Sequence, residues 1–555
     1  MQDQANGTSQ SLPFGLMQDW PLTVDKVIDH ALAAHNQQEV VTRSVAGPIV
    51  RKTYGQIHND ARRVSEALLA HGMKPGDMIA TMAWNSDLHM ETWFGTMGLG
   101  MVLHTLNPRL FPQQIAWIAN HAEDKALFFD TTFLPLIEAI APHLPMVKLF
   151  VIYGDDSVVP EKTAIPNLKS YESFLSGSTG SNIQWGGFDE RTACGLCYTS
   201  GTTGNPKGVL YSHRSNVLHT LMSMQSGALG ISSQEIVLPI VPMFHANAWG
   251  LTFSGPASGA KLVMPGCRMD GEAIYELLDS EKVTISAAVP TVWQMLHEYL
   301  VKENKKLPHL NSVVIGGAAT PEGLMRAFEE DFDVQVFPAW GMTETSPLGT
   351  VSRLPQQLEN ISDDEKMFHK MKQGRAPFGM EMDVVGPDGK SLPRDGVSAG
   401  HLKVRGPAVA SAYLKGEGSA LDERGFFDTG DVANIDEYGQ MHITDRSKDV
   451  IKSGGEWISS IALENICMSH PKVAIAGAIG IHHPKWDERP LMVVQLKKGE
   501  SLSKEEVISF YAGKIAKWWT PDDVVFVDEI PLGSTGKINK LALRETFKDY
   551  KLPDC

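Results

Sequence analysis

The chain has 555 residues, of which 43% are hydrophobic and 21% are charged. This composition is ordinary for a globular protein, and the length predicts two or more domains. The formal net charge of -16 argues against a general nucleic-acid binder or a protein of anionic membrane surfaces, although it leaves room for a local ATP or CoA pocket.

The first sixteen residues lack a positively charged start followed by an apolar run. They are therefore interpreted as a short disordered lead rather than a signal peptide. The most apolar stretch, 236–253, contains polar residues and prolines, so no transmembrane segment is expected.

Five cysteines in so long a chain form no disulfide framework and favour a reducing, cytoplasmic location. Cys194 and Cys197 make a C-x-x-C pair, which raises the alternative of redox or metal chemistry. Neither a second pair nor a nearby histidine cluster supports that alternative. Three residues apart on a strand, the two side chains point to opposite faces, so packing is the preferred interpretation.

Apolar, strand-like runs alternate with helical patterns through the first three quarters of the chain. The fold class predicted from this alternation is α/β, with layers built on buried sheets. The strands expected are 78–84, 126–129, 147–153, 283–289 and 312–315, and the helices begin near Ser86 and cover 133–141 and 291–302.

The pattern changes from about Glu381, where short strands carry Pro-Asp-Gly and Gly-Pro turns. These turns predict a small antiparallel barrel or meander over about 381–440. After Arg446 comes a compact tail with its own α/β pattern. The predicted organisation is a large N-terminal domain (1–446), a boundary at 447–449 and a small C-terminal domain (450–555).

The segment from Tyr198 to Gly208, YTSGTTGNPKG, combines four serine and threonine hydroxyls, three glycines and a lysine. Glycine-rich turns present consecutive N–H groups as an anion site, and Lys207 adds a mobile positive charge. A polyphosphate fits these groups, although the spacing differs from the common P-loop. The preceding apolar run ACGLCYTS predicts a buried strand that leads into the loop.

This motif resembles the phosphate loop of the adenylate-forming superfamily, which contains acyl-CoA synthetases, adenylation domains and beetle luciferases. Further motifs follow in the family's order over most of the chain. Their wording is similar to that of bacterial medium-chain fatty acid and 3-methylmercaptopropionate CoA ligases.

The resemblance implies an ATP site built from several segments. Gly316-Gly317-Ala318 follows an apolar strand, where α/β ligand sites form, and matches the family's adenine-contacting loop. Glu344, beside Thr343, is expected to hold Mg²⁺ together with Thr202 and phosphate oxygens. Asp431 is expected to accept hydrogen bonds from ribose. The full ATP/AMP set is Thr199, Ser200, Gly201, Thr202, Thr203, Gly204, Lys207, Gly316, Gly317, Ala318, Trp340, Gly341, Met342, Thr343, Asp431 and Arg446.

The resemblance also assigns roles in the C-terminal domain. Lys537, in PLGSTGKINK, matches the catalytic lysine, which would neutralise the carboxylate and the α-phosphate. Lys448 matches the hinge residue about which this domain rotates. The loop that would line the CoA channel contains Gly454, Gly455, Glu456 and Trp457.

His245 lies among aromatic residues in MFHANAW. By its type alone it reads as a satisfied core histidine, whereas the family places a residue here that gates the acyl pocket, so a role in positioning the substrate is expected. The pocket is expected to comprise His245, Trp249, Val289, Pro290 and Gly316.

The expected activity is ATP-dependent ligation of a short- to medium-chain aliphatic acid to CoA through an acyl-adenylate, releasing AMP and pyrophosphate. Two alternatives remain open: an adenylation enzyme that loads a separate carrier protein, and an ATP-binding regulatory protein without catalysis. The expected small-molecule partners are the acid, ATP, Mg²⁺ and CoA, with no nucleic acid. Analogy with related ligases favours a homodimer.

Overall fold

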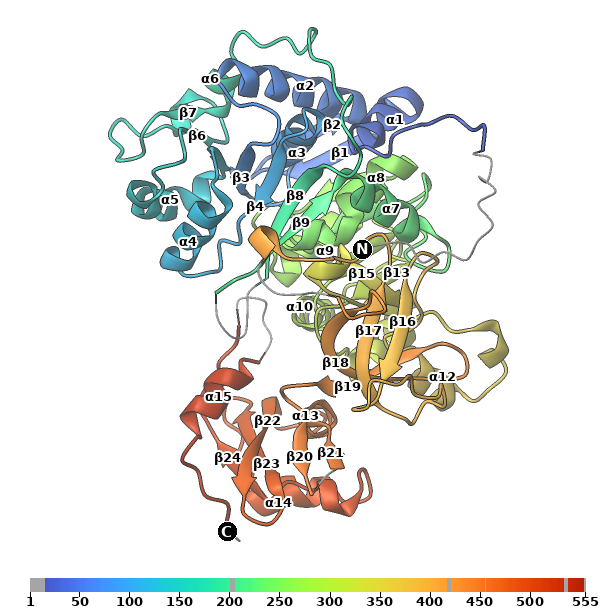
Figure 1. Cartoon of the computed structure of the whole chain (residues 1–555). Coiled ribbons are helices and arrows are strands. Elements are labelled where there is room, and N and C mark those ends of the chain that lie inside the picture. Colours follow the sequence, from blue (N-terminus) through green and yellow to red (C-terminus); the bar gives the residue numbers. More distant parts are fainter. Residues whose placement is uncertain (1–14, 200–204, 417–420, 455, 534–537, 554–555) are drawn as a thin grey trace.

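The computed structural model describes residues 15–199, 205–416, 421–454, 456–533 and 538–553 (Figure 1). The expected disordered lead falls almost wholly before these residues. Two large sheets form the body of the protein, and a small antiparallel sheet and a further α/β unit follow them along the chain.

The first sheet has eight strands in the order β15-β14-β13-β12-β10-β11-β1-β2. Its inner strands are parallel, and the edge strands β2 and β15 run antiparallel to their neighbours. The strands are β1 (Glu39–Arg43), β2 (Ile49–Thr53), β10 (Ile236–Pro239), β11 (Lys261–Met264), β12 (Ile285–Ala288), β13 (Ser312–Ile315), β14 (Gln335–Gly341) and β15 (Leu348–Val351).

The second sheet has seven strands in the order β7-β6-β5-β3-β4-β8-β9. It is parallel except for β9, which forms an antiparallel hairpin with β8. The strands are β3 (Met78–Met82), β4 (Val102–Thr105), β5 (Ala126–Phe129), β6 (Leu149–Ile152), β7 (Leu168–Ser170), β8 (Ala193–Tyr198) and β9 (Gly208–Ser212).

Helices cover both faces of each sheet. Successive strand residues point to opposite faces, so Ile79 packs in the core between the sheets and Ala80 in the core outside the second sheet. The helices between the sheets are α1 (Asp25–His35), α2 (Tyr54–Ala70), α3 (Asp87–Gly98), α7 (His213–Met224) and α8 (Leu251–Ser258). The short helix α6 (Tyr171–Leu175) packs in the same core as these helices. The outer helices are α4 (Pro112–Ala122) and α5 (Leu134–Ile140) on the second sheet, and α9 (Gly271–Ser280), α10 (Pro290–Lys302) and α11 (Glu322–Arg326) on the first.

The α/β prediction is confirmed, and several elements have the expected bounds. Strands β5 and β13 begin and end where the apolar runs do. Helix α3 starts after Ser86, whose hydroxyl accepts the N–H of His89 at 3.2 Å and so caps the first turn. Strand β3 stops before the predicted end because the Trp84 N–H turns away to the Asp130 carboxylate.

The small sheet is an antiparallel meander in the order β16-β17-β18-β19, the second of the two expected forms. Its strands are β16 (Glu381–Val385), β17 (Gly400–Arg405), β18 (Phe427–Ile435) and β19 (Met441–Arg446), and α12 (Asp363–Lys370) precedes it. The last unit contains β20 (Ile451–Ser453), β21 (Glu456–Ile458), α13 (Ser460–Met468), β22 (Val473–His483), β23 (Asp487–Leu496), α14 (Lys504–Phe510), β24 (Asp523–Phe526) and α15 (Lys540–Thr546).

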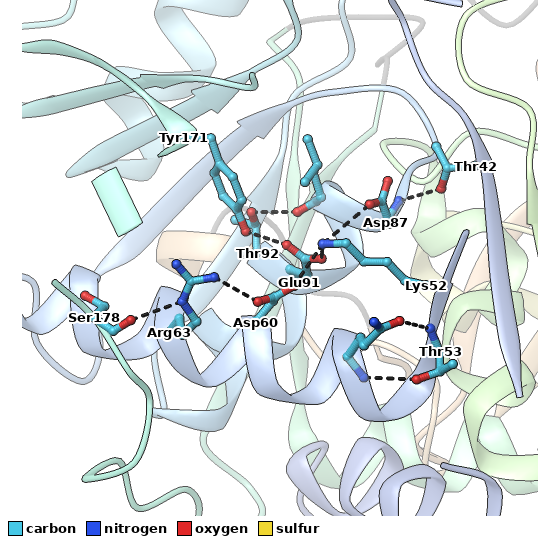
Figure 2. Close-up of polar contacts among 12 residues, drawn as sticks. Thr42, Lys52, Thr53, Asp60, Arg63, Asp87, Glu91, Thr92, Tyr171 and Ser178 are labelled. Atoms are coloured by element: carbon cyan, nitrogen blue, oxygen red, sulfur yellow. Dashed lines mark hydrogen bonds and ion pairs between the residues drawn. The ribbon is translucent and has the colours of Figure 1, made fainter. Parts of the chain in front are cut away.

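A buried charge network joins β2, α2 and α3 (Figure 2). The Lys52 ammonium donates to Glu91 and to Asp60, the latter at 2.9 Å, and lies 3.7 Å from Asp87. The Tyr171 hydroxyl donates to the second oxygen of Glu91 at 2.8 Å. The network ties helices of the central layer to the hairpin at the edge of the first sheet.

The C-x-x-C pair packs as the strand geometry predicts. The Cys194 sulfur accepts a hydrogen bond from the Asn216 amide at 3.2 Å, whereas the Cys197 sulfur lies 3.2 Å from the Thr105 hydroxyl in a different cluster. Both cysteines are free and buried, and burial raises the pKa of each thiol. Across the described part of the chain, no group of three His, Cys, Asp or Glu side chains could hold a metal.

Within that same part of the chain, no helix is both long and apolar enough to cross a bilayer.

Candidate active site

The predicted phosphate loop connects β8 to β9. The hairpin closes where the Thr199 N–H donates to the Lys207 carbonyl at 2.9 Å, and Tyr198 pairs with Gly208. Gly208 has no room for a side chain without displacement, since a Cβ there would lie 3.1 Å from Leu196, Tyr198 and Leu414. The central loop residues 200–204, among them the expected metal ligand Thr202, lie outside the described residues.

Lys207 and Glu344 come together through a residue that the sequence analysis did not single out. The Lys207 ammonium lies 4.9 Å from the centre of the Tyr413 ring. The hydroxyl of the same tyrosine donates to Glu344 Oε1 at 2.8 Å. A cation from the phosphate loop and a carboxylate from the turn after β14 therefore share one aromatic side chain.

The main chain around Glu344 is fixed from two sides. The Tyr211 hydroxyl on β9 donates to the Thr343 carbonyl at 2.8 Å, and the Ala410 N–H donates to the Glu344 carbonyl at 2.8 Å. These bonds connect the turn both to the hairpin of the second sheet and to the chain that leaves the small sheet. The position of the Glu344 carboxylate thus depends on three separate segments.

Glu344 fits a magnesium ligand by its environment. Its side chain is nearly buried, and burial raises the pKa of the carboxyl group, while the Tyr413 hydrogen bond opposes that shift. A nearby dication would favour the ionised form and would compensate the desolvation. Magnesium is commonly bound by one or two carboxylates together with substrate phosphates, so one well-placed carboxylate suffices.

Asp431 is held by two other residues of the expected nucleotide site. The Trp340 indole N–H donates to Asp431 Oδ2 at 2.9 Å, and Arg446 Nε lies 2.7 Å from Oδ1. The arginine and the aspartate are register partners on β18 and β19. An ionised carboxylate only accepts hydrogen bonds, which is the chemistry that a ribose diol requires.

Gly316 and Gly317 form a tight turn after β13. A Cβ on Gly316 would lie 2.9 Å from the Trp249 ring, and one on Gly317, whose φ is +83°, would lie 3.2 Å from Val289. The structure therefore brings together three of the expected acyl-pocket residues, and Pro290 follows as the first residue of α10. Gly317 and Ala318 are exposed at this edge of the sheet.

The segment after His245 has an unusual backbone. Ala246, Asn247, Ala248 and Trp249 have φ between 44° and 60°, and Gly250 has φ 80°. A left-handed conformation costs roughly 1–2 kcal/mol for each residue with a side chain, so the surrounding contacts must hold this turn. Such strain concentrates at functional sites. The half-buried His245 precedes the turn. The turn places the Trp249 ring against Gly316.

Two contacts fasten the left-handed turn. The Cys197 thiol on β8 lies 3.8 Å from the amide oxygen of Asn247 and donates to it, and the Thr252 hydroxyl on α8 donates to the Asn247 carbonyl at 3.2 Å. The turn is thus connected to the strand that leads into the phosphate loop. Sequence patterns contained no sign of this conformation, because alanine and tryptophan rarely adopt it.

Of the residues expected in the C-terminal domain, those that the structure describes do not lie beside Lys207 and Glu344. Figure 1 shows β20 and β21, which flank the Gly454 turn, in the lower unit, well away from β9 and β15. Gly454 packs against Trp486, and the Trp457 ring lies 5.8 Å from that of His401 on β17. The exposed Lys448 lies in the connection after β19. Lys537, Gly455 and the Glu456 side chain fall outside what the structure describes.

Residues 28–414 match the family model of AMP-binding enzymes, and residues 462–537 match the model of their C-terminal domain. The chain belongs to the AMP-binding enzyme family. This confirms the resemblance drawn from the phosphate-loop motif.

Relatives in the AMP-binding family cover nearly the whole chain. It is 48% identical over 539 residues to a 3-methylmercaptopropionyl-CoA ligase of Ruegeria lacuscaerulensis, which covers 96% of this chain and 99% of the relative. It is 44% identical over 539 residues to a medium-chain-fatty-acid–CoA ligase of Ectopseudomonas oleovorans, with 97% and 98% covered. The fold is similar to that of an anthranilate CoA ligase in complex with anthranoyl-AMP (TM-score 0.83, 24% identity, 95% and 98% covered).

Proposed function

We propose that this AMP-binding enzyme is an acyl-CoA ligase for short- to medium-chain aliphatic acids, working with ATP, Mg²⁺ and CoA. The observation that carries the proposal is the convergence of Lys207 and Glu344 on Tyr413, at the mouth of a glycine-rich hairpin. The near-full-length relatives named as CoA ligases support the same activity.

The first half-reaction joins the acid to AMP. A carboxylate oxygen attacks the α-phosphorus of ATP, the bond to the bridging oxygen breaks, and pyrophosphate leaves with that oxygen. Lys207 would neutralise the departing phosphates and Asp431 would hold the ribose. Magnesium bound at Glu344 would supply charge neutralisation along the phosphates. Lys537 is proposed as the aimed cation at the α-phosphate.

In the second half-reaction the sulfur of CoA attacks the acyl carbon, the thiol loses its proton and AMP leaves. This step needs a channel for the thiol, for which we propose Gly454, Gly455, Glu456 and Trp457. We also propose that residues 450–555 rotate about Lys448, so that Lys537 and the channel loop act in turn. One family-model match ends at residue 414 and the other begins at residue 462, on either side of Lys448, which supports this division into two domains.

The residues around Gly316 and Gly317 are apolar. Trp249 packs on Gly316 and Val289 on Gly317, so we propose these residues, with Pro290 and His245, as the wall of the acyl pocket. Such a wall favours an alkyl or thioether tail over a second carboxylate. The free, buried thiols are consistent with a reducing compartment, and we place the enzyme in the cytoplasm. The homodimer remains a proposal from analogy.

The test is a screen of acids from C2 to C16, with 3-methylmercaptopropionate and aromatic acids included. Pyrophosphate release and acyl-CoA, detected by mass spectrometry, are measured with ATP, Mg²⁺ and free CoA. We expect both products with short to medium aliphatic acids. Glu344→Gln should lower the rate at least about a hundredfold, as loss of an aimed electrostatic group does, whereas the exposed Glu359→Gln should not.

Pyrophosphate release without acyl-CoA would redirect the proposal to a separate carrier protein as acceptor. If none of the acids leads to pyrophosphate release, only a non-catalytic ATP-binding role remains.

A further inference from the structure

A strap of chain, residues 408–416, leaves the small sheet and lies across β9 of the second sheet. The Ser346 hydroxyl donates to the Ala408 carbonyl at 2.7 Å, and Lys415 pairs with Glu123 of the turn after α4 at 3.0 Å. Between these two anchors the strap packs against Cys197, Val209 and Tyr211. Figure 1 shows its end as an orange turn beside β9. The strap thus connects the small sheet to the β8–β9 hairpin that carries the phosphate loop.

Tyr413 is the residue of this strap that lies between the two charged groups. We propose that Tyr413 is a positioning residue that aligns Lys207 and Glu344 for the magnesium-bound polyphosphate of ATP. The inference rests on the proposed function. It adds to the ATP site a residue that was not among those expected from the sequence.

Tyr413 can contact both charged groups because its ring face and its hydroxyl form different interactions. The ring face attracts the Lys207 ammonium at 4.9 Å, within the range of cation–π contacts. The hydroxyl donates to Glu344 at 2.8 Å and stabilises the ionised carboxylate that a metal requires. Burial and the neighbouring carboxylate raise the pKa of Tyr413, so its proton stays available for donation.

The alternative is that Tyr413 has only a structural role, in which its ring packs the strap against β9. Packing accounts for the ring against Val209 and Tyr211, but it does not need a hydroxyl aimed at a nearly buried carboxylate. Two substitutions separate these contributions. Tyr413→Phe keeps the ring and removes the hydrogen bond, whereas Tyr413→Leu removes both.

The experiment is isothermal titration calorimetry with ATP as the probe, once in Mg²⁺ and once in EDTA. Tyr413→Phe should weaken binding about tenfold in Mg²⁺ and leave it unchanged in EDTA, because hydrogen bonds to charged groups are worth about that factor. Tyr413→Leu should weaken binding in both buffers, since Lys207 also loses its support. Tyr438→Phe, the same change in the turn after β18, is the control, and thermal melting checks that all variants fold.

Wild-type affinity of Tyr413→Phe in Mg²⁺, or an equal loss in both buffers, would overturn the inference while the proposed ligase stands. If the wild-type protein fails to bind ATP at all, the proposed function and this inference both fail.

Discussion

His219 lies buried on α7, and its Nε2 accepts the N–H of Leu348 at the start of β15 at 3.0 Å. Its ring also packs against the left-handed turn, since a Cβ on Gly250 would lie 2.8 Å from it. Burial lowers the pKa of His219 to about 4, so the ring is neutral in the folded protein. One neutral imidazole therefore contacts both the left-handed turn and the strand that follows Glu344.

This pKa predicts how stability depends on pH. The unfolded ring has a pKa near 6.5, so the stabilisation by neutral His219 is complete above about pH 6.5. It is lost as the pH falls toward the folded pKa of about 4, by about 3 kcal/mol in total. His219→Gln keeps an acceptor without titrating in this range and should lose less stability between pH 7 and pH 4.5.

The measurement is the midpoint of urea unfolding at the two pH values. The exposed His143→Gln serves as control and should behave as the wild type does. Parallel losses in all three proteins would show that His219 does not drive the change.

Single residues show both the strength and the limit of prediction from the sequence. The pairing of Trp340 and Arg446 with Asp431 joins three residues that motifs had marked separately. Tyr413 was missed because its role depends on the strap crossing onto another sheet, and no local spacing records such a crossing. His219 was missed for the same reason, since its partner lies more than a hundred residues away.

At the scale of elements, the network of Figure 2 shows that packing α2 and α3 against β2 removes charged side chains from water. Lys52 is surrounded by Asp60, Asp87 and Glu91, and these carboxylates keep the lysine charged and raise its pKa. Burial acts to raise the pKa of Glu91, and the Lys52 ammonium acts in the opposite direction by stabilising the ionised form. Three carboxylates around one ammonium are stable only while that ammonium is present.

Lys52→Met should therefore destabilise the protein by about 3–5 kcal/mol, because it leaves buried carboxylates without their counter-ion. Urea unfolding at pH 7 measures the loss. Lys302→Met is the matched control, since Lys302 is mostly exposed and pairs with Glu303 at the surface, where such pairs contribute little. A loss no larger than in this control would refute the role of the network.

The elements themselves were largely predictable, but their order in the sheets was not. Apolar runs placed β5, β13 and α10 within a residue or two, because burial of a parallel strand leaves a continuous apolar signature. Strand β1 pairs with β11, and neither segment contains a sequence signal that specifies this pairing. Long-range pairing is decided by the packing of whole layers.

At the scale of the molecule, the described part of the C-terminal unit contacts the small sheet through polar bonds and through the ring of Trp457 against His401. Ser460 Oγ on α13 donates to the Asp445 carboxylate at 2.8 Å, and Arg544 on α15 lies 2.8 Å from Asp449. Inter-domain interfaces that are not large and hydrophobic permit relative motion of the domains, which agrees with the proposed rotation about Lys448.

The rotation predicts that the two half-reactions fail separately. Lys537→Ala should lose adenylation by about a hundred- to a thousandfold and still convert supplied acyl-AMP and CoA to thioester. Lys448→Pro, which stiffens the hinge, should spare adenylation and impair thioester formation. Each half-reaction is measured alone, by pyrophosphate release and by acyl-CoA from acyl-AMP. Equal damage to both steps in either variant would count against two alternating faces.

The pairing of β1 with β11 also has a consequence for synthesis. Val40 meets Leu262, so the ribosome must make more than two hundred further residues before the first hairpin finds its neighbour. During that time the exposed edge of β1 is open to wrong partners, and contacts so distant along the chain slow folding. We therefore expect the nascent chain to benefit from a chaperone until β11 has been synthesised.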